Sequence, residues 1–224
     1  MNYYFDFREK RIVVFKRMLR GESLHPNHEI LKKNLFQNFA LIESCGLKSL
    51  YDIQQALLTE EKIAKFSIKS FVSIEYLSVL NDEIKSYHPT PLQIQSFEFI
   101  NPNIIEKLSK SGIETSFQLH KQVFSFTQRV HLCRNLGINY KETDTLAKLS
   151  DFSRIRYLSQ AFIGFLMDSK FDTINKIVNT NSRLLFEHLI ELQEKKENYQ
   201  EKITQSCIQQ LIRDAQYISS AIEI

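Results

Sequence analysis

Turn-forming residues are scarce in this sequence: only five glycines and four prolines occur among its 224 residues. Tight hairpins and Gly-rich barrels need many such residues, so the scarcity argues against most all-β folds and favours helices joined by short turns. Tryptophan is absent, whereas hydrophobic residues make up 43% and charged residues 25% of the chain. This balance argues against a disordered or membrane-embedded chain and predicts a globular protein that buries a core without disulfides or metals.

Long apolar runs are also lacking. The longest, 162–167, is far shorter than the ~20 residues that a bilayer-spanning helix needs. Residues 1–11 carry charges where a signal peptide would have its apolar centre, so we expect a cytoplasmic protein with no membrane partner. The three cysteines, Cys45, Cys133 and Cys207, are isolated and odd in number, which is typical of reduced, mostly buried thiols.

One segment is strongly basic in a chain whose net charge is only +3. Residues 8–20 hold six of the 29 basic residues and a single acid, Glu9. On a helical wheel the apolar residues of this segment share one side and most of its basic residues share the other, which predicts an amphipathic helix. The basic side either binds phosphate or forms the solvated face of a core-packing helix, and the sequence leaves both interpretations open.

An internal repeat is the strongest organisational signal. Residues 42–53 and 108–119 have the same pattern at an offset of 66: a helix end, a glycine, an aliphatic residue, a spacer, Ser or Thr, and a new helix. The same offset places 72–74 over 138–140, where an aliphatic residue again precedes a helix-capping side chain. Two matches on one offset make chance agreement less probable and favour duplication of a helical unit.

The repeated pattern predicts a helix-turn-helix corner. A glycine just past a helix can adopt the left-handed conformation that ends it, so we expect positive φ at Gly46, Gly112 and Gly137. Ser or Thr then accepts hydrogen bonds from the first amides of the next helix, and an acidic or amide residue three positions later completes a capping box. The predicted boxes are Ser49 with Asp52 and Thr115 with Gln118.

A third copy aligns residues 97–108 with 155–166 at an offset of 58. That offset places Lys170 at the position of Gly112 and Thr173 at the position of Thr115. The third corner has therefore lost its glycine, and Lys170 or a neighbour must make the turn in another way. Most phenylalanines, Phe36, Phe39 and Phe71 among them, occupy apolar positions of helical patterns and are expected in the core rather than at a base-stacking surface.

Residues 149–162, followed by Phe171, Asp172 and Thr173, resemble a bacterial family known as domain of unknown function 4332, which is grouped with helix-hairpin-helix proteins. The residues near both termini, 3–7 and 222–224, look like those of longer members of that family. The resemblance implies an all-α fold of consecutive helix-hairpin-helix-like (SAM-like) repeats. It also implies sequence-independent binding of the DNA or RNA phosphate backbone, because hairpin glycines in such modules expose amides at a helix N-terminus.

The hairpins depart from the family pattern because neither keeps its glycine: one reads Leu158-Ser159-Gln160 and the other Ile100-Asn101-Pro102. Basic residues nonetheless lie close to both, beside the third hairpin and inside the helix after the second. An arginine pair on a solvated turn explains the first group equally well. The candidate nucleic-acid-binding residues are Arg154, Arg156, Ser159, Lys107, Lys110 and Asn101.

Catalytic motifs were sought and are not found. The sequence has no Gly-rich phosphate loop, closely spaced cysteine pair, zincin-type histidine pair or nucleophile elbow. His25 and His28 are separated by Pro26, which marks a turn, and His131 and Cys133 would point to different faces of a helix. We therefore expect a non-catalytic protein with no metal and no cofactor.

The prolines at positions 89 and 91 break the helix before them and suggest a boundary between a part at 1–88 and a part at 89–224. The fold class predicted is all-α, with one possible short strand pair between residues 3–7 and 221–224. Two functions remain open, a nucleic-acid-binding module and a protein-interaction scaffold that has lost the phosphate site. Clustering of the candidate basic residues on one face would favour the first, and dispersal with an exposed apolar groove would favour the second.

Overall fold

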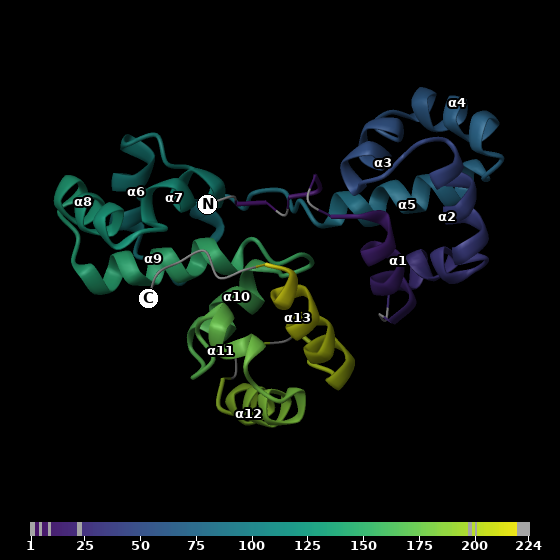
Figure 1. Ribbon diagram of the computed structural model, residues 1–224. Helices are drawn as coiled ribbons and strands as arrows, with labels where there is room; N and C mark the ends of the chain where they lie inside the picture. Colours follow the sequence, from purple (N-terminus) through teal and green to yellow (C-terminus); the bar gives the residue numbers. More distant parts are fainter. Residues whose placement is uncertain are drawn as a thin grey trace. The chain divides into compact units, whose positions relative to one another are not determined.

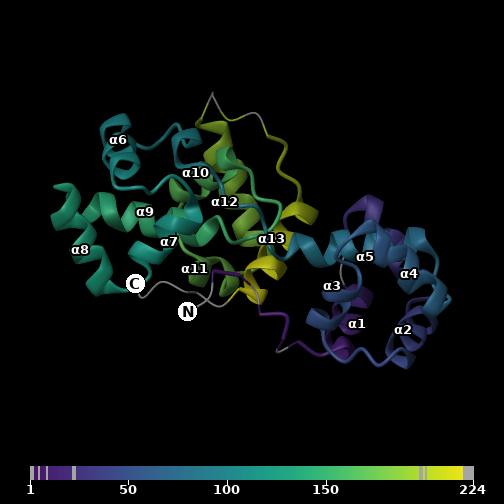
Figure 2. The ribbon, with the colours of Figure 1, turned by 90° about the horizontal axis from the view of Figure 1, so that it is seen from above.

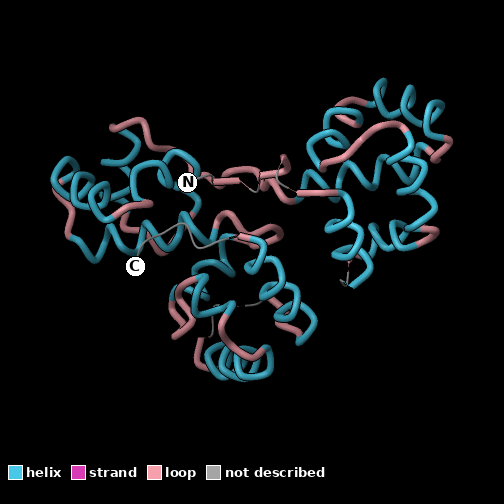
Figure 3. The backbone as a smooth tube through the Cα atoms, in the orientation of Figure 1, coloured by secondary structure: helices cyan, strands magenta, loops and turns pink. Residues whose placement is uncertain are grey.

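The computed structural model describes residues 3–4, 6–8, 10–21, 24–196, 199 and 201–218. Over these residues the fold is all-α, with helices, turns and no strand (Figures 1 and 3), as the scarcity of turn-forming residues predicts. The chain divides into two compact units. The N-terminal unit comprises residues 5–88, and the C-terminal unit comprises residues 1–4 and 89–224. No helix of the described residues has the length and apolar character needed to cross a membrane.

In the N-terminal unit, α5 (Ile74–Ser86) is central: it packs against α3, α4 and the 3-10 helix η1. Fully buried residues such as Phe15, Phe39 and Leu80 fill the space between the helices. The other elements are α1 (Ile12–Gly21), η1 (Pro26–Lys32), α2 (Leu35–Ser44), α3 (Leu50–Ala56) and α4 (Glu60–Ser70). The predicted basic helix is α1, whose buried face is Ile12, Phe15 and Leu19.

In the C-terminal unit, α7 packs against α8 and α9, and α13 packs against α11 and α12 (Figure 2). Phe97, Leu119, Phe152 and Leu189 belong to one buried apolar cluster that joins these helices. The elements are η2 (Ile94–Ser96), α6 (Pro102–Lys110), α7 (Ser116–Val123), α8 (Phe126–Leu136), α9 (Tyr140–Phe152), α10 (Gln160–Met167), α11 (Ile174–Val178), α12 (Ser182–Glu194) and α13 (Gln205–Tyr217).

The corner predictions are confirmed. Gly46, Gly112 and Gly137 have φ of 92°, 74° and 58°, and each lies just after a helix end. These are left-handed conformations, in which a Cβ is disfavoured. Both predicted capping boxes form, at the start of α3 and at the start of α7.

The first two corners share a further contact that the sequence pattern does not reveal. In the N-terminal unit the Leu50 amide donates to the Lys10 carbonyl at 3.0 Å, and in the C-terminal unit the Ser116 amide donates to the Leu92 carbonyl at 2.8 Å. A short extended segment therefore pairs with the residue that follows each helix cap, as the isolated bridges Arg11 with Ser49 and Gln93 with Thr115 also record.

The third corner turns without a left-handed residue. The Ser169 hydroxyl donates to the Leu166 carbonyl at 2.7 Å and accepts from the Phe171 amide at 3.0 Å, and Thr173 caps α11. A serine side chain thus provides the hydrogen bonds of the turn that Gly112 makes by its backbone conformation. The residue beside Lys170, and not Lys170 itself, compensates for the missing glycine.

Two expectations need correction. Phe36 and Phe71 were expected in the core with Phe39, but their side chains are 60% and 86% exposed. Phe71 lies at the C-cap of α4, where the chain turns away from the helix, so the helical spacing no longer decides which way its ring points.

The pairing predicted between residues 3–7 and 221–224 lies outside the described residues, because 221–224 are not among them. Tyr3 is buried in the C-terminal unit. Its hydroxyl lies 2.8 Å from Ser116 Oγ and donates to the Ser153 carbonyl at 3.3 Å. Its ring meets those of Phe117 and His120 edge-on, so the start of the chain is fixed by α7 and the end of α9.

Candidate functional site

The two arginines predicted to contact phosphate are interior residues. Arg154 and Arg156 are each only 5% exposed. The Arg154 guanidinium forms an ion pair with Asp151, and its Nε donates to the Tyr3 carbonyl at 2.9 Å. Arg156 Nε lies 2.6 Å from Asp214 Oδ1 on α13.

This placement corrects both sequence interpretations of the arginine pair, the phosphate contact and the solvated turn. A guanidinium that is buried and paired with a carboxylate joins helices inside the protein, and it is not presented to an external phosphate.

The hairpin between α9 and α10 has its left-handed residue at Tyr157, whose φ is 63°. The sequence does not reveal this position, because an exposed tyrosine gives no signal of positive φ. Ser159 caps α10 by accepting from the Phe162 amide at 3.0 Å, and its hydroxyl donates to Glu201 Oε1 at 2.5 Å. The start of α10 thus has its own carboxylate nearby, and a phosphate approaching Ser159 would meet a like charge.

The candidate residues of the second hairpin also have local roles. Asn101 caps α6 by accepting from the Asn103 amide at 2.9 Å. Lys107 Nζ donates to the Gly137 carbonyl at 3.0 Å, which attaches α6 to the corner between α8 and α9. Lys110 is exposed and pairs with Glu106 at 2.6 Å, and its hydrogen bond lowers the pKa of that carboxyl group.

The six candidate residues therefore do not form one basic surface. Arg154 and Arg156 are buried in ion pairs, whereas Ser159 and Asn101 cap helices. Lys107 bonds the carbonyl group at the end of α8, and Lys110 forms an exposed ion pair. This is the dispersed arrangement that favours the scaffold interpretation, provided that an exposed apolar groove exists.

A groove whose lining is part apolar and part polar lies in the C-terminal unit, between residues 96–99, α10, and the residues Lys195, Lys196 and Tyr199. Its volume is about 830 Å³. Its aromatic part is built from Phe99, Phe165 and Tyr199, and the rings of Phe165 and Tyr199 stack 4.2 Å apart at an angle of 13°. Burial raises the pKa of the Tyr199 hydroxyl, and so does the Glu201 carboxylate that accepts its hydrogen bond, so this group is a neutral donor at ordinary pH.

Gly164 on α10 gives the groove its shape. A Cβ at this position would lie 2.8 Å from the nearest ring carbon of Phe99, a distance that ring could not tolerate without moving. An isolated glycine inside a helical pattern is the sequence signal of such a close approach. It could have indicated that another segment lies against α10, but not that the segment carries Phe99.

The rim of the groove is charged with both signs. Asp168 and Lys196 form an ion pair with each other, and Glu98 and Lys195 are exposed. An aromatic floor with a mixed charged rim suits an apolar or aromatic side chain of a polypeptide, whereas a polyanion would need a rim of one sign.

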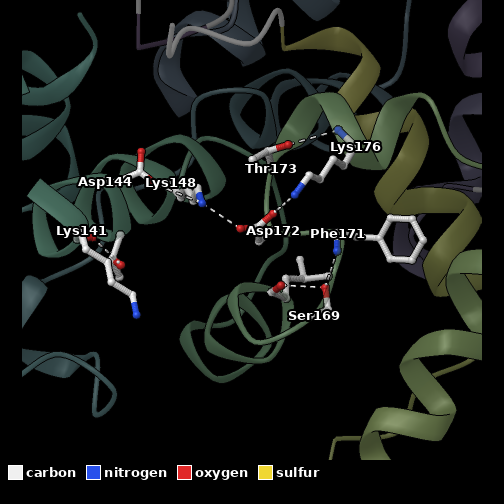
Figure 4. A network of polar contacts seen from close by, with 10 residues as sticks. Lys141, Asp144, Lys148, Ser169, Phe171, Asp172, Thr173 and Lys176 are labelled. Atoms are coloured by element: carbon white, nitrogen blue, oxygen red, sulfur yellow. Dashed lines mark hydrogen bonds and ion pairs between the residues drawn. The ribbon is translucent and has the colours of Figure 1, made fainter. Parts of the chain in front are cut away.

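A second polar cluster is structural. Lys148 on α9 pairs with Asp144 at 3.0 Å and with Asp172 at 2.8 Å, and Lys176 on α11 pairs with Asp172 at 2.5 Å (Figure 4). Burial raises the pKa of Asp172, but hydrogen bonds from the two lysines outweigh it and leave the pKa lowered. Asp172 therefore links the third corner to α9 through Lys148. Its carboxylate is already paired with two lysines, so it is not available to hold a ligand.

Comparison with known proteins gives one match. The model of the family described as domain of unknown function 4332 matches residues 98–218. No curated protein sequence and no solved structure matches the chain. The matched region contains most of the groove residues, the buried Arg154 and Arg156, and the third corner between α10 and α11.

Proposed function

The chain belongs to the family described as domain of unknown function 4332, and we propose that it is a non-catalytic protein-binding module. Its binding site is the aromatic groove of the C-terminal unit. The observation that carries this proposal is the combination of an open groove of about 830 Å³ with the stacked rings of Phe165 and Tyr199. The bound group is an apolar or aromatic side chain of a partner polypeptide.

The size and lining of the groove support this function. Sites for small groups are concave, have volumes of about 300–1,000 Å³, and combine apolar walls with a few polar groups. Aromatic residues supply large contact areas and are enriched where protein partners bind most tightly. Here Phe99 and Tyr199 provide the accessible contact area, the buried Phe165 ring supports Tyr199 from below, and the charged rim orients the partner chain around the bound side chain.

Nucleic-acid binding has less support from the same residues. Counterion release requires exposed cations that can neutralise phosphates. Of the four basic candidates, Arg154 and Arg156 are buried with aspartates, Lys107 is bonded to a carbonyl group, and Lys110 is paired with Glu106.

Titration of the full chain with N-acetyl-phenylalaninamide tests the proposed groove. We expect the probe to shift the backbone amide signals of Ala161 and Gly164 in a heteronuclear NMR spectrum, with millimolar affinity because the probe is small. Ala161→Arg places a long charged side chain on the exposed first turn of α10 and should abolish these shifts. Ala40→Arg, at an exposed site on α2, is the matched control and should leave them unchanged.

The contrary result is equally concrete. Absence of groove shifts at saturating probe would refute the proposal. Titration with labelled single- and double-stranded DNA and RNA over a salt series tests the other function in parallel. Salt-sensitive binding that Lys107→Ala and Lys110→Ala weaken, and that Ala161→Arg leaves intact, would favour the nucleic-acid module instead.

A further inference from the structure

An exposed apolar projection lies in the N-terminal unit, at the corner between α4 and α5. Ile68 is 79% exposed, Phe71 is 86% exposed and Ile74 is 54% exposed. We call these three side chains the apolar knob. Single exposed apolar residues need no explanation, but three within seven residues around one corner are a feature of the kind that marks interaction sites.

The backbone of the knob makes Phe71 unusual. Its φ is 59°, almost equal to the 58° of Gly137, which occupies the matching position at the corner between α8 and α9. Each is followed by a buried aliphatic residue, Val72 or Ile138, and then by the cap of the next helix. Glycine adopts this conformation without strain and phenylalanine does not.

Among the described residues, core packing does not account for the ring of Phe71. It is almost fully exposed, so it adds little to the core. The corner already has the Ser70 hydroxyl, which donates to the Phe66 carbonyl at 2.7 Å and accepts from the Val72 amide at 3.3 Å. A strained residue that does not serve the fold points to a role outside it.

We propose that the apolar knob of one copy of the chain docks into the aromatic groove of a second copy. This inference rests on the proposed function and names the partner of the same groove. The shapes are complementary, because a convex phenylalanine would enter a concave site whose accessible rings are Phe99 and Tyr199. Aromatic side chains favour offset or edge-on contacts with other rings, which a groove of this composition offers.

The charges around the two surfaces are complementary as well. Exposed Lys69 and Glu75 flank Phe71 on either side along the chain, at the end of α4 and at the start of α5. Exposed Glu98 and Lys195 border the groove. The knob is therefore flanked by one cation and one anion, and the groove rim also carries both signs. A docked knob can place opposite charges together, whereas a uniformly charged partner would meet repulsion.

The proposed contact is head-to-tail, because each copy contributes a knob to one neighbour and a groove to another. Such heterologous contacts close into rings or continue into chains, and they do not make a symmetric pair from one patch. Three exposed side chains cover much less than the ~1,200 Å² that stable interfaces bury, so we expect weak association that depends on protein concentration.

Sedimentation equilibrium of the full chain over a range of concentrations tests the inference. We expect reversible self-association of the wild type, and at least tenfold weaker association of both Phe71→Gly and Ala161→Arg. Phe71→Gly removes the ring at a position where glycine suits the backbone, so loss of folding would not explain the effect. Phe36→Ala, at another exposed aromatic residue of the N-terminal unit, is the control and should associate as the wild type does.

Mixing the two defective variants gives the sharpest result. Phe71→Gly keeps the groove and Ala161→Arg keeps the knob, so an equimolar mixture should form a heterodimer that does not grow further. A mixture that stays monomeric, or a wild type that is monomeric at every concentration, overturns the inference. If N-acetyl-phenylalaninamide still binds the groove in that case, only the partner is wrong; if it does not, the proposed function fails too.

Discussion

The two units bury very different interiors. In the N-terminal unit the described buried polar residues are few, and Glu83, paired with His28 at 2.6 Å, is the one buried carboxylate. The C-terminal unit buries two arginine–aspartate pairs, a third arginine, Arg129, and His120. All of these residues lie inside the region 98–218 that the family model matches.

This difference bears on how strictly the amino-acid sequence of each unit determines its fold. Apolar packing in the N-terminal unit tolerates substitution by residues of similar volume. Buried ion pairs require one arrangement of partners, since a charge left alone in the interior is costly. The C-terminal unit should therefore be the less tolerant of the two, and each of the following predictions tests that comparison.

The largest effect is expected from breaking a buried ion pair in the C-terminal unit. Asp214→Ala leaves the Arg156 guanidinium buried without its carboxylate, and we expect it to lower the free energy of unfolding by about 3–5 kcal/mol. Native-state hydrogen exchange measures each unit separately. Glu187→Ala, which breaks the exposed pair with Arg183, is the control and should cost no more than about 1 kcal/mol.

The N-terminal counterpart should respond more weakly. Glu83→Ala removes the carboxylate that bonds His28, but an imidazole can be neutral and a guanidinium cannot. The His28 side chain is also 14% exposed, so water can replace part of the lost bond, and we expect a loss of about 1–3 kcal/mol. A loss equal to that of Asp214→Ala would contradict the contrast drawn between the two interiors.

The next effect is a pH dependence of the C-terminal unit that arises from His120. Burial, assisted by the positive charge of Arg154, lowers the pKa of His120 to about 4. Between pH 6.5 and pH 4 the unfolded chain binds a proton at this residue and the folded chain does not, so stability is full above pH 6.5 and falls as pH decreases. The slope should approach about 1.4 kcal/mol per pH unit in that window.

His120→Phe isolates this contribution, because the replacement does not titrate and can still pack against Tyr3 and Phe124. The difference in stability between the variant and the wild type should change with pH over the same window, while the other titrating groups cancel. Hydrogen exchange of the C-terminal unit at several pH values measures it. Parallel profiles for the two proteins would refute a neutral, buried His120.

The next effect concerns the N-terminal residues that belong to the C-terminal unit. Tyr3→Phe keeps the buried ring but removes the hydroxyl that contacts Ser116 and Ser153, so we expect a loss of about 1 kcal/mol. Ser116 still accepts from the Leu92 amide at 3.0 Å, which limits the cost. Tyr140→Phe, at an exposed residue, is the control and should have no measurable effect on hydrogen exchange.

Local features were predictable from the sequence and distant ones were not. The glycine corners and capping boxes depend on residues within about four positions of one another, so Gly112 and Thr115 contain the whole signal. The partners of Arg156 and Tyr3 lie 58 and 113 positions away, at Asp214 and Ser116. No periodicity links such pairs, and an arginine beside a turn has the same sequence signature whether its partner is a buried aspartate or a phosphate.

The groove could not be predicted from the sequence for a related reason. Gly164 was visible as an interruption of an apolar run, but the ring that requires it, Phe99, comes from a different segment. Phe71 was assigned to the core by helical spacing, which holds only inside the helix and not at its left-handed C-cap. In both cases the tertiary arrangement, and not the local pattern, decides the role of the residue.

The smallest effect compares the matching corners of the two units directly. Phe71→Gly relieves the left-handed strain of a non-glycine residue, although glycine loses more chain entropy on folding, so we expect a gain in stability of about 0.5 kcal/mol. Gly137→Phe makes the opposite change and should cost about 1 kcal/mol, since only Lys107 lies near the added Cβ, at 4.0 Å, and its flexible side chain can move. Hydrogen exchange within each unit measures both changes. If Phe71→Gly raises stability and Gly137→Phe lowers it, the Phe71 ring is held at a cost to the fold, as expected of a residue kept for an external contact. If Phe71→Gly lowers stability, the ring stabilises its own unit.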